Sequence, residues 1–297
     1  MPDVLIRPWR RWRSRAHCLV AGACLLLGLV LPCGGSAATR LVVEDYAVTG
    51  WTVEDGLPHN LVHAIAQDAR GLLWAATWEG AARFNGRSFR VFDRENTPGA
   101  ELSGVFNFLP EANGDMLAGT ADGVYRYHDG VWSPVAPGLA GVRVDAMMRG
   151  QDGSLWVAAL FRLYQLGADG QLRELSASYA LPGARITTLA QQPDGVLVVG
   201  TEDGLYRIID GKAQAWGREL GMGDTTVRRL IPDRQGGWYL AADNGVWQIS
   251  AAGQAVHLRP SRRTDTVMLD RNGVLWINES AGDVVRRDPR GNETAPS

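Results

Sequence analysis

One phrase of about ten residues recurs six times along this chain, and its spacing limits the folds that the chain can adopt. The first copy, residues 71–80, reads Gly-x-x-Trp-x-x-Thr-x-x-Gly. The later copies follow at steps of 43, 39, 42, 41 and 37 residues and begin at Gly114, Gly153, Gly195, Gly236 and Gly273. A period of about 40 residues is typical of one four-stranded propeller blade, whereas helical hairpin repeats show apolar residues at a spacing of about 3.6. The repeat predicts an all-β propeller of about six four-stranded blades, with seven blades or an incomplete ring as the alternatives.

The fourth repeat shows how one unit divides into strands. Residues 186–191 read as a first strand, and residues 196–200 form a continuous apolar run that is typical of a strand buried on both faces. Residues 205–209 and 212–216 read as the third and fourth strands, with Gly211 in the hairpin between them, because glycine accepts a positive φ without steric cost. The same hairpin glycine returns in every repeat, and capped helical stretches are not recognisable there.

The fourth position of the recurring phrase holds a tryptophan in three repeats and another large or apolar residue in the others. These residues are Trp74, Leu117, Trp156, Val198, Tyr239 and Trp276. We interpret this position as the one that fills the wedge between neighbouring blades, because Leu and Val replace Trp there and a buried ring removes a large apolar area from water. A binding role, such as stacking on a sugar, is the alternative.

The first 38 residues differ from the repeats and have the features of a signal peptide. Five arginines lie between residues 7 and 15, an apolar run extends from about Cys18 to Leu31, and small residues precede Thr39. The apolar run is shorter than the roughly 17–25 residues of a membrane-spanning helix. The order of these segments fits an export signal that is cleaved after Ala38. We expect a periplasmic or secreted protein, with an uncleaved membrane anchor as the alternative.

The mature chain is expected to contain no cysteine and to carry a negative net charge. Cys18, Cys24 and Cys33 all lie in the predicted signal peptide, so disulfides would not stabilise the exported domain. Without residues 1–38, the 30 basic and 32 acidic residues become 25 and 31, a net charge of about −6. The sequence shows neither a basic stripe nor a second apolar run of spanning length. We therefore expect no nucleic-acid partner and no stable membrane insertion after cleavage.

Several short phrases near the first repeat occur in the order that is found in a known family. They are Asp-Gly-Leu-Pro-x-Asn at 55–60, Val-x-x-Ile-x-Gln-Asp at 62–68, Gly-x-Leu-Trp at 71–74 and Gly-x-x-Arg-Phe-x-Gly at 80–86. This set resembles the two-component regulator propeller family. The resemblance extends from about residue 41 to residue 291.

The resemblance implies a periplasmic sensor propeller for extracellular ligands, often carbohydrates or their breakdown products. In that family the propeller precedes a small β-sandwich, a membrane helix and a cytoplasmic histidine kinase or diguanylate cyclase. This sequence ends at Ser297 with none of these features, so we expect the signalling partner to be a separate membrane protein. We divide the chain into a signal peptide at 1–38, a propeller sensor domain at 39–291 and a disordered tail at 292–297.

No arrangement of residues in the sequence is typical of an enzyme or a metal site. His59 and His63 are four residues apart but lie in a loop that runs into a strand, where this spacing does not form a compact ligand pair. The acidic pairs at 54–55 and 202–203 fall in turns, where carboxylates accept backbone hydrogen bonds. We expect no catalytic residue, metal or cofactor. A protein-interaction scaffold and, less favoured, a propeller lyase or glycan-active enzyme are the alternative functions.

The candidate ligand-binding residues come from loops that meet on one face of the predicted propeller. Loops between the second and third strands share this face with the loops that join consecutive blades, at the mouth of the central channel. The candidates are His59, Asn60, Trp78, Glu79, Phe161, Arg162, Glu202, Asp203, Asp243, Asn244 and Glu279. Aromatic rings beside arginine and carboxylates fit a carbohydrate or a small organic ligand. Local loop packing is the alternative for each residue.

Two terminal segments bear on how the ring of blades closes. Residues 284–287 read as the third strand of the sixth blade, but residues 292–297 are too polar for an apolar outer strand. Residues 41–48 form an apolar, strand-like stretch in the register of a fourth strand, with no blade of its own. We predict that residues 41–48 complete the sixth blade from the N-terminal side and cover its exposed edge.

Overall fold

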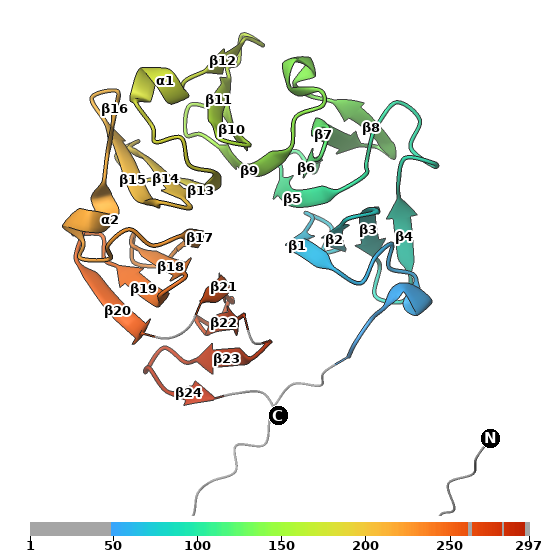
Figure 1. The fold of residues 1–297 in the computed structure, drawn as a ribbon. Helices are drawn as coiled ribbons and strands as arrows, with labels where there is room; N and C mark the ends of the chain where they lie inside the picture. The colour runs from blue at the N-terminus through green and yellow to red at the C-terminus, as the bar shows by residue number, and fades with distance from the viewer. Residues whose placement is uncertain (1–48, 261–262, 281, 295–297) are drawn as a thin grey trace, which may run out of the picture. The chain divides into compact units, whose positions relative to one another are not determined.

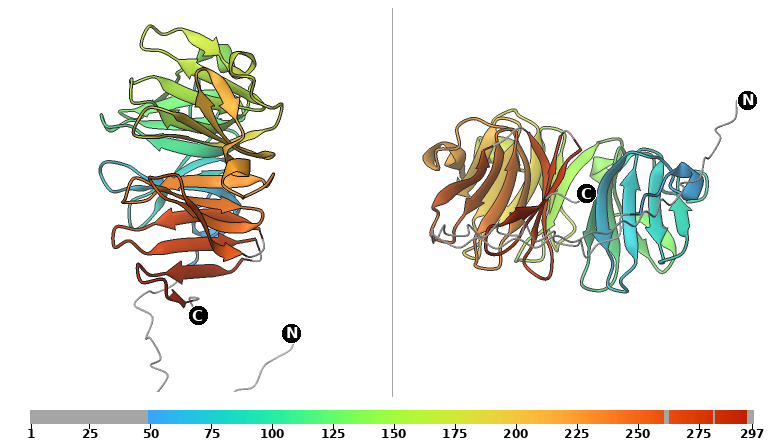
Figure 2. Two further views of the ribbon diagram at one scale, coloured as in Figure 1. Left: turned by 90° about the vertical axis from the view of Figure 1, so that its left-hand side faces the viewer. Right: turned by 90° about the horizontal axis from the view of Figure 1, so that it is seen from below.

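The computed structural model describes residues 49–260, 263–280 and 282–294 of the chain. Within these residues the chain forms 24 strands in six antiparallel sheets of four. The sheets are arranged as blades in a ring, with the first strand of each blade at the centre (Figure 1). In the edge-on views of Figure 2 the strands run between the two faces of the ring. The prediction of an all-β propeller with six four-stranded blades is confirmed.

The blades follow one another along the chain. Blades 1 and 2 contain β1 (Val62–Gln67), β2 (Leu73–Thr77), β3 (Gly80–Phe84), β4 (Phe89–Phe92), β5 (Val105–Pro110), β6 (Met116–Thr120), β7 (Gly123–His128) and β8 (Val131–Pro134). Blades 3 and 4 contain β9 (Val144–Arg149), β10 (Leu155–Ala159), β11 (Arg162–Leu166), β12 (Leu172–Glu174), β13 (Ile186–Gln191), β14 (Leu197–Thr201), β15 (Gly204–Ile209) and β16 (Lys212–Gln214). Blades 5 and 6 contain β17 (Val227–Pro232), β18 (Trp238–Ala242), β19 (Gly245–Ile249), β20 (Ala255–Pro260), β21 (Thr264–Leu269), β22 (Leu275–Glu279), β23 (Val284–Arg287) and β24 (Glu293–Thr294).

Short helices lie in the connections between blades and before the first one. They are η1 (Val53–Asp55), η2 (Pro137–Leu139), α1 (Ser176–Tyr179) and α2 (Trp216–Glu219). The fourth strand of the fourth repeat was predicted to reach residue 216, and this bound is wrong. Trp216 instead begins α2 and is buried in the core that blades 4 and 5 share.

The turn before the second strand is built around an aspartate. Asp68 Oδ1 accepts a hydrogen bond from the backbone N–H of Leu72 at 3.0 Å, and its Oδ2 accepts one from Trp74 Nε1 at 3.1 Å. Burial would raise the pKa of the Asp68 carboxyl, but the hydrogen bonds from Trp74 and the backbone outweigh it and hold that pKa below its usual range. Asp270 is placed in the same way beside Trp276 in blade 6. One carboxylate therefore shapes the turn and orients the blade tryptophan.

Neighbouring blades pack face to face through alternate residues of their first strands. The fourth residue faces the preceding blade, as shown by Phe108 between blades 1 and 2 and by Val267 between blades 5 and 6. The fifth residue faces the following blade, as shown by Leu109 and Ile231. This alternation follows from the two-residue period of a strand. A residue's place in the repeat therefore predicts which neighbour it touches.

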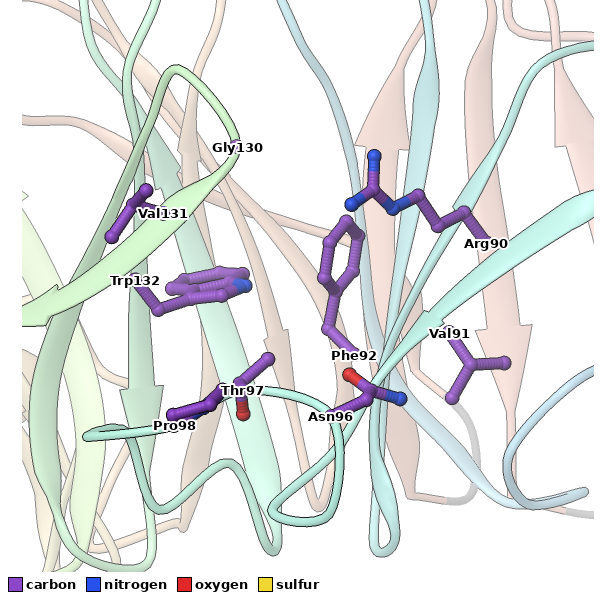
Figure 3. Close-up of a pocket in the computed structure, with 9 residues that line it drawn as sticks. All are labelled: Arg90, Val91, Phe92, Asn96, Thr97, Pro98, Gly130, Val131 and Trp132. Carbon is purple, nitrogen blue, oxygen red and sulfur yellow. The ribbon is translucent and has the colours of Figure 1, made fainter.

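The junction between blades 1 and 2 is an aromatic core. Trp74 is 1 % exposed, stacks on Phe92 with ring centroids 5.4 Å apart and meets Trp132 edge-on at 5.9 Å. Figure 3 shows the outer end of this junction, where a groove of about 500 Å³ opens between β4 and β8 and the Arg90 guanidinium lies 5.0 Å from the Phe92 ring centroid. The prediction that tryptophans of the repeat fill the wedge between blades is confirmed for Trp74 and for the buried Trp156.

The outer strand of the sixth blade differs from the prediction. Residues 292–297 are predicted to be a disordered tail, but Glu293 and Thr294 form β24 and pair with Arg287 and Arg286 of β23. Glu293 forms ion pairs with Arg287 at 2.9 Å and with Arg259 of β20. Charge pairing thus holds a strand too polar to be recognised by its apolar content. Residues 41–48, which we predict to fill this position, lie outside the described residues.

Candidate functional site

Each blade has a β-bulge near the start of its first strand. In blade 1, Val62 pairs with Thr77 and Ala64 with Ala76, so His63 has no partner in β2. The extra residues of the six blades are His63, Phe106, Asp145, Thr187, Arg228 and Asp265. Because the first strands line the centre of the ring (Figure 1), these six residues lie around one end of the central channel. We call them the bulge ring.

The bulge ring differs in character from the position that precedes it. The preceding position holds a β-branched residue in every blade and is buried in blades 2 to 6; its residues are Val62, Val105, Val144, Ile186, Val227 and Thr264. The bulge ring itself carries an imidazole, a phenyl, two carboxylates, a hydroxyl and a guanidinium. Bulges re-aim side chains and are frequent next to binding sites. The uniform position therefore belongs to the scaffold, and the varied one is the candidate for specific recognition.

Aromatic side chains form the part of the channel mouth that belongs to blades 1 and 2. Trp78, which is 43 % exposed, contacts His63 edge-on with ring centroids 4.9 Å apart and Phe106 edge-on at 5.2 Å. The Arg143 guanidinium lies 3.8 Å from the Phe106 ring centroid, which is a cation–π contact. Burial, with a further contribution from the Arg143 charge, lowers the pKa of His63, so its imidazole is neutral at pH 7. Its Nε2 atom is buried and makes no hydrogen bond within the described residues.

Ion pairs continue the mouth across blades 3 and 4. Asp145 Oδ1 accepts hydrogen bonds from Arg143 Nε at 2.9 Å and from Arg185. Arg185 also lies 3.9 Å from Glu202 in the β14–β15 turn. The hydrogen bond to Asp145 raises the pKa of the Arg185 guanidinium, so Arg185 stays charged at neutral pH. Asp145 Oδ2 is buried without a hydrogen-bond partner among the described residues, which leaves one acceptor for a bound molecule.

A second group of ion pairs lies in blades 5 and 6. Arg228 binds the Asp243 carboxylate through two nitrogen atoms, at 2.7 and 3.1 Å. This hydrogen bonding lowers the pKa of Asp243, although burial opposes it. Arg263 pairs with Asp265 at 2.7 Å and lies 3.9 Å from Asp243. The mouth is therefore aromatic on one side and charged on the other, an arrangement suited to a ligand with an apolar face and polar groups.

Three of the predicted site residues belong to this mouth: Trp78, Glu202 and Asp243. His59 and Asn60 instead fold the loop before β1. The Nδ1 atom of His59 accepts a hydrogen bond from the Leu61 N–H at 2.9 Å, and Asn60 Oδ1 accepts one from the Val53 N–H at 2.9 Å. These two side chains are occupied by local structure.

The predicted turn residues on the same loops have varied environments. Glu79 and Asp203 are exposed, and their backbone N–H groups donate to the threonines that end β2 and β14. Phe161 is exposed in the β10–β11 turn, while Arg162 pairs with Glu174 of the outer strand β12 at 3.2 Å. The Arg162 guanidinium is thus directed away from the channel.

The remaining two predicted residues support neighbouring elements. Asn244 Oδ1 accepts a hydrogen bond from Trp247 Nε1 at 2.9 Å, and its Nδ2 donates to the Met222 carbonyl at 3.3 Å. Glu279 accepts a hydrogen bond from Arg259 Nε at 2.7 Å. Both side chains hold blade connections in place.

Sequence reasoning missed most of the bulge ring and the arginines beside it. Of these residues only His63 was considered, and only as a metal ligand. The signal that could have found the others is a variable polar or aromatic residue after the β-branched residue that starts each first strand, as in Val144-Asp145 and Val227-Arg228. Among the residues that the structure describes, no group of three or more His, Cys, Asp or Glu side chains is placed to hold a metal ion.

The sequence comparison agrees with the resemblance drawn from the repeats. Residues 56–79 match the family model described as the two component regulator propeller. This match confirms that the chain carries a repeat of that family. A search of curated proteins found no match.

Solved structures with the same fold include extracellular domains of two component systems and an enzyme. The extracellular domain of the hybrid two component system BT3049 from B. thetaiotaomicron has a TM-score of 0.71 and 21 % identity, over 83 % of this chain and 36 % of that one. The corresponding domain of BT4673 from the same organism has a TM-score of 0.66 and 22 % identity, over 79 % and 32 %. Virginiamycin B lyase from Staphylococcus aureus with quinupristin has a TM-score of 0.62 and 14 % identity, over 79 % and 83 %.

These likenesses establish the fold, and the chain spans about a third of the length of the two extracellular-domain structures. Those two structures have higher TM-scores than the lyase. No helix of the described residues is long and apolar enough to cross a membrane.

Proposed function

We propose that this chain is a sensor propeller of a two-component or diguanylate-cyclase signalling system and binds a small ligand at the bulge ring. The observation that carries the proposal is the bulge itself, which recurs in all six blades and presents six residues of five chemical types around one opening. A scaffold function alone does not require the position next to a uniform β-branched residue to vary so widely. The family match at residues 56–79 supports the signalling context.

The chemistry of the mouth favours a carbohydrate or a small organic ligand. Trp78 and Phe106 supply aromatic edges and faces, and the arginine–carboxylate pairs supply donors and acceptors in fixed orientations. Asp145 Oδ2 and His63 Nε2 are buried atoms that a ligand hydroxyl could satisfy. The described residues provide no metal cluster, so we propose a function without a metal or another cofactor.

The proposed location is the periplasm or the cell exterior, reached through a signal peptide that is cleaved after Ala38. The sensor structures with the same fold are described as extracellular domains, which supports this location. The output in our proposal comes from a separate membrane signalling protein. N-terminal sequencing of the exported protein tests the cleavage site.

The binding proposal is tested by thermal-shift screening and calorimetry of the chain against oligosaccharides and small organic acids. Trp78→Ala and Phe106→Ala should weaken the ligand that is found, whereas Phe161→Ala, an exposed ring of another loop, should not. Binding that is unaffected at positions 78 and 106 would reject the bulge ring as the site. Turnover of the bound molecule would favour an enzyme, and the lyase with the same fold makes that outcome worth measuring. Binding of proteins alone would favour the scaffold.

A further inference from the structure

The junction between blades 6 and 1 is packed differently from the other five. The fourth residue of β1, Ile65, faces blade 6 and is 72 % exposed, whereas Leu230 and Val267 at the same place in blades 5 and 6 are buried. Leu73, the first residue of β2, is 41 % exposed, although the corresponding residues of β6, β10, β14, β18 and β22 are all buried. Blade 1 therefore exposes an apolar face whose equivalent is buried in the other blades.

Blade 6 presents the matching apolar surface. Met268 is the fifth residue of β21 and, by its place in the repeat, faces blade 1; it is 55 % exposed. The corresponding Ile231 of β17 packs in the core between blades 5 and 6. β1 and β21 face each other across the gap between blades 6 and 1 (Figure 1). Two apolar surfaces thus face each other without packing together.

A cavity of about 600 Å³ occupies this space. Its lining comes from β1, β17, β21 and β22 and includes His63, Ile65, Arg229, Ile231, Met268 and Leu269. The volume is within the range of small-molecule pockets, about 300–1,000 Å³, and is too small for a further four-stranded blade. Most of the lining is aliphatic, so the cavity suits a small apolar body.

Arg229 gives the cavity one positive charge. Among the described residues it forms no ion pair with a carboxylate, and the cavity lining contains no acidic side chain. Arg229 is exposed to solvent, although the protein atoms near its guanidinium lower the pKa of that group by desolvation. An arginine that lines a cavity and has no acidic partner there favours an anionic ligand.

We propose that the cavity between β1, β17 and β21 binds a carboxylate with an apolar body, with the carboxylate on Arg229 and the body between Ile65 and Met268. This inference rests on the proposed ligand-binding function and adds a ligand class and a position. A sugar, which needs many hydrogen bonds, finds few polar groups in this lining, and a cationic ligand would be repelled by Arg229. Because the ligand touches both β1 and β21, its binding fills the one open junction and stabilises the ring.

The test uses octanoate as the probe, with octanol and octylamine as neutral and cationic probes of equal length. Calorimetry should show one octanoate per chain, an increase in the thermal midpoint and weaker or no binding of the other two. Arg229→Met keeps the length and apolar stem of the side chain and should weaken octanoate by about tenfold or more. Arg271→Met, at an exposed arginine in the β21–β22 turn, is the matched control and should bind octanoate normally.

Met268→Trp provides a second variant that fills the cavity and leaves Arg229 in place. It should abolish octanoate binding while raising the thermal midpoint of the free protein. The proposal is overturned if octanoate fails to bind, if octanol or octylamine binds equally well, or if Arg229→Met and Met268→Trp bind octanoate as the unaltered chain does. If octanoate does not bind but another ligand binds in a way that depends on Trp78 and Phe106, this inference is rejected. The proposed function then still stands.

Discussion

The junction between blades 1 and 2 and the junction between blades 6 and 1 are made from the same repeat but end in different states. Trp74 at the first junction and Trp276 at the second occupy the same position of the repeat. The indole Nε1 of each donates a hydrogen bond to the aspartate of the preceding turn, at 3.1 and 3.2 Å. Trp74 is enclosed by the rings of Phe92 and Trp132, whereas Trp276 is half-buried with the Arg286 guanidinium 5.2 Å from its ring centroid. Equal local structure therefore does not produce equal burial.

The difference lies in what the next blade supplies. Blade 2 offers aromatic rings to Trp74, but blade 1 turns its own aromatic residues toward the segment that precedes it. Trp51 lies over Phe84 and Phe89, with ring centroids 5.1 and 6.3 Å apart. The face that could receive blade 6 is thus partly occupied by the chain leading into blade 1. Blades 1 and 6 are left with the cavity between them.

The largest expected difference between the two junctions is in the tryptophans. Trp74→Ala should lower the free energy of unfolding by about 3–5 kcal/mol, because it removes the centre of a closed aromatic cluster. Trp276→Ala should cost less than half of that, because its ring is only partly removed from water. Denaturant unfolding of both variants measures the contrast. Equal losses would show that the sixth junction is as well packed as the first.

A second contrast concerns the aliphatic residues of the first strands. Leu230→Ala should lower the free energy of unfolding by about 2–4 kcal/mol, because its side chain is buried between blades 4 and 5. Ile65→Ala, at the same place in blade 1, should cost less than about 1 kcal/mol, since most of that side chain is already in water. Chemical denaturation of the two variants measures both losses of unfolding free energy. A loss at Ile65 as large as that at Leu230 would indicate that blade 6 covers blade 1 in solution.

The turn aspartates provide a case in which the two junctions should agree. The pKa of Asp68 and that of Asp270 are held below the usual value, so each contributes stability that is complete above pH 5 and is lost as the pH falls through the folded-state pKa. Asp68→Asn and Asp270→Asn should each cost about 1 kcal/mol at pH 7 and flatten the acid-induced loss of stability. Unfolding curves between pH 7 and pH 3 measure this. A slope that is unchanged in either variant would remove that carboxylate from the explanation.

The smallest expected effect concerns the outer strand of blade 6. Glu293→Gln should lower the free energy of unfolding by at most about 1 kcal/mol, because its ion pairs with Arg259 and Arg287 are partly exposed. The loss should shrink in 1 M salt, since screening weakens such pairs. By contrast, the buried Trp132 of β8 should make the outer strand of blade 2 insensitive to salt. Hydrogen exchange of β23 and β7 in low and high salt compares the two edges directly.

Much of the architecture could be predicted because it depends on local rules. Gly211 and Gly195 have φ values of 70° and 90°, as the predicted turns require, and the apolar runs became the second strands. The candidate site was predicted only in part. Trp78, Glu202 and Asp243 lie at the channel mouth, but Arg162 pairs with Glu174 of the outer strand and Asn244 binds Trp247 and the Met222 carbonyl. Loop position alone does not say where a long side chain finds its partner.

The sequence by itself determined the number of blades, the strands, the turns and the direction in which each strand residue faces, because these follow from periods of two and about 40 residues and from the backbone freedom of glycine. Only the tertiary structure decided which of those residues are buried, which charges are paired and where space remains. The bulge residues of the six blades form one ring, and Arg229 lacks an acidic partner among the described residues. Burial and pairing depend on which surfaces meet when the ring assembles, and a single repeat does not contain that information.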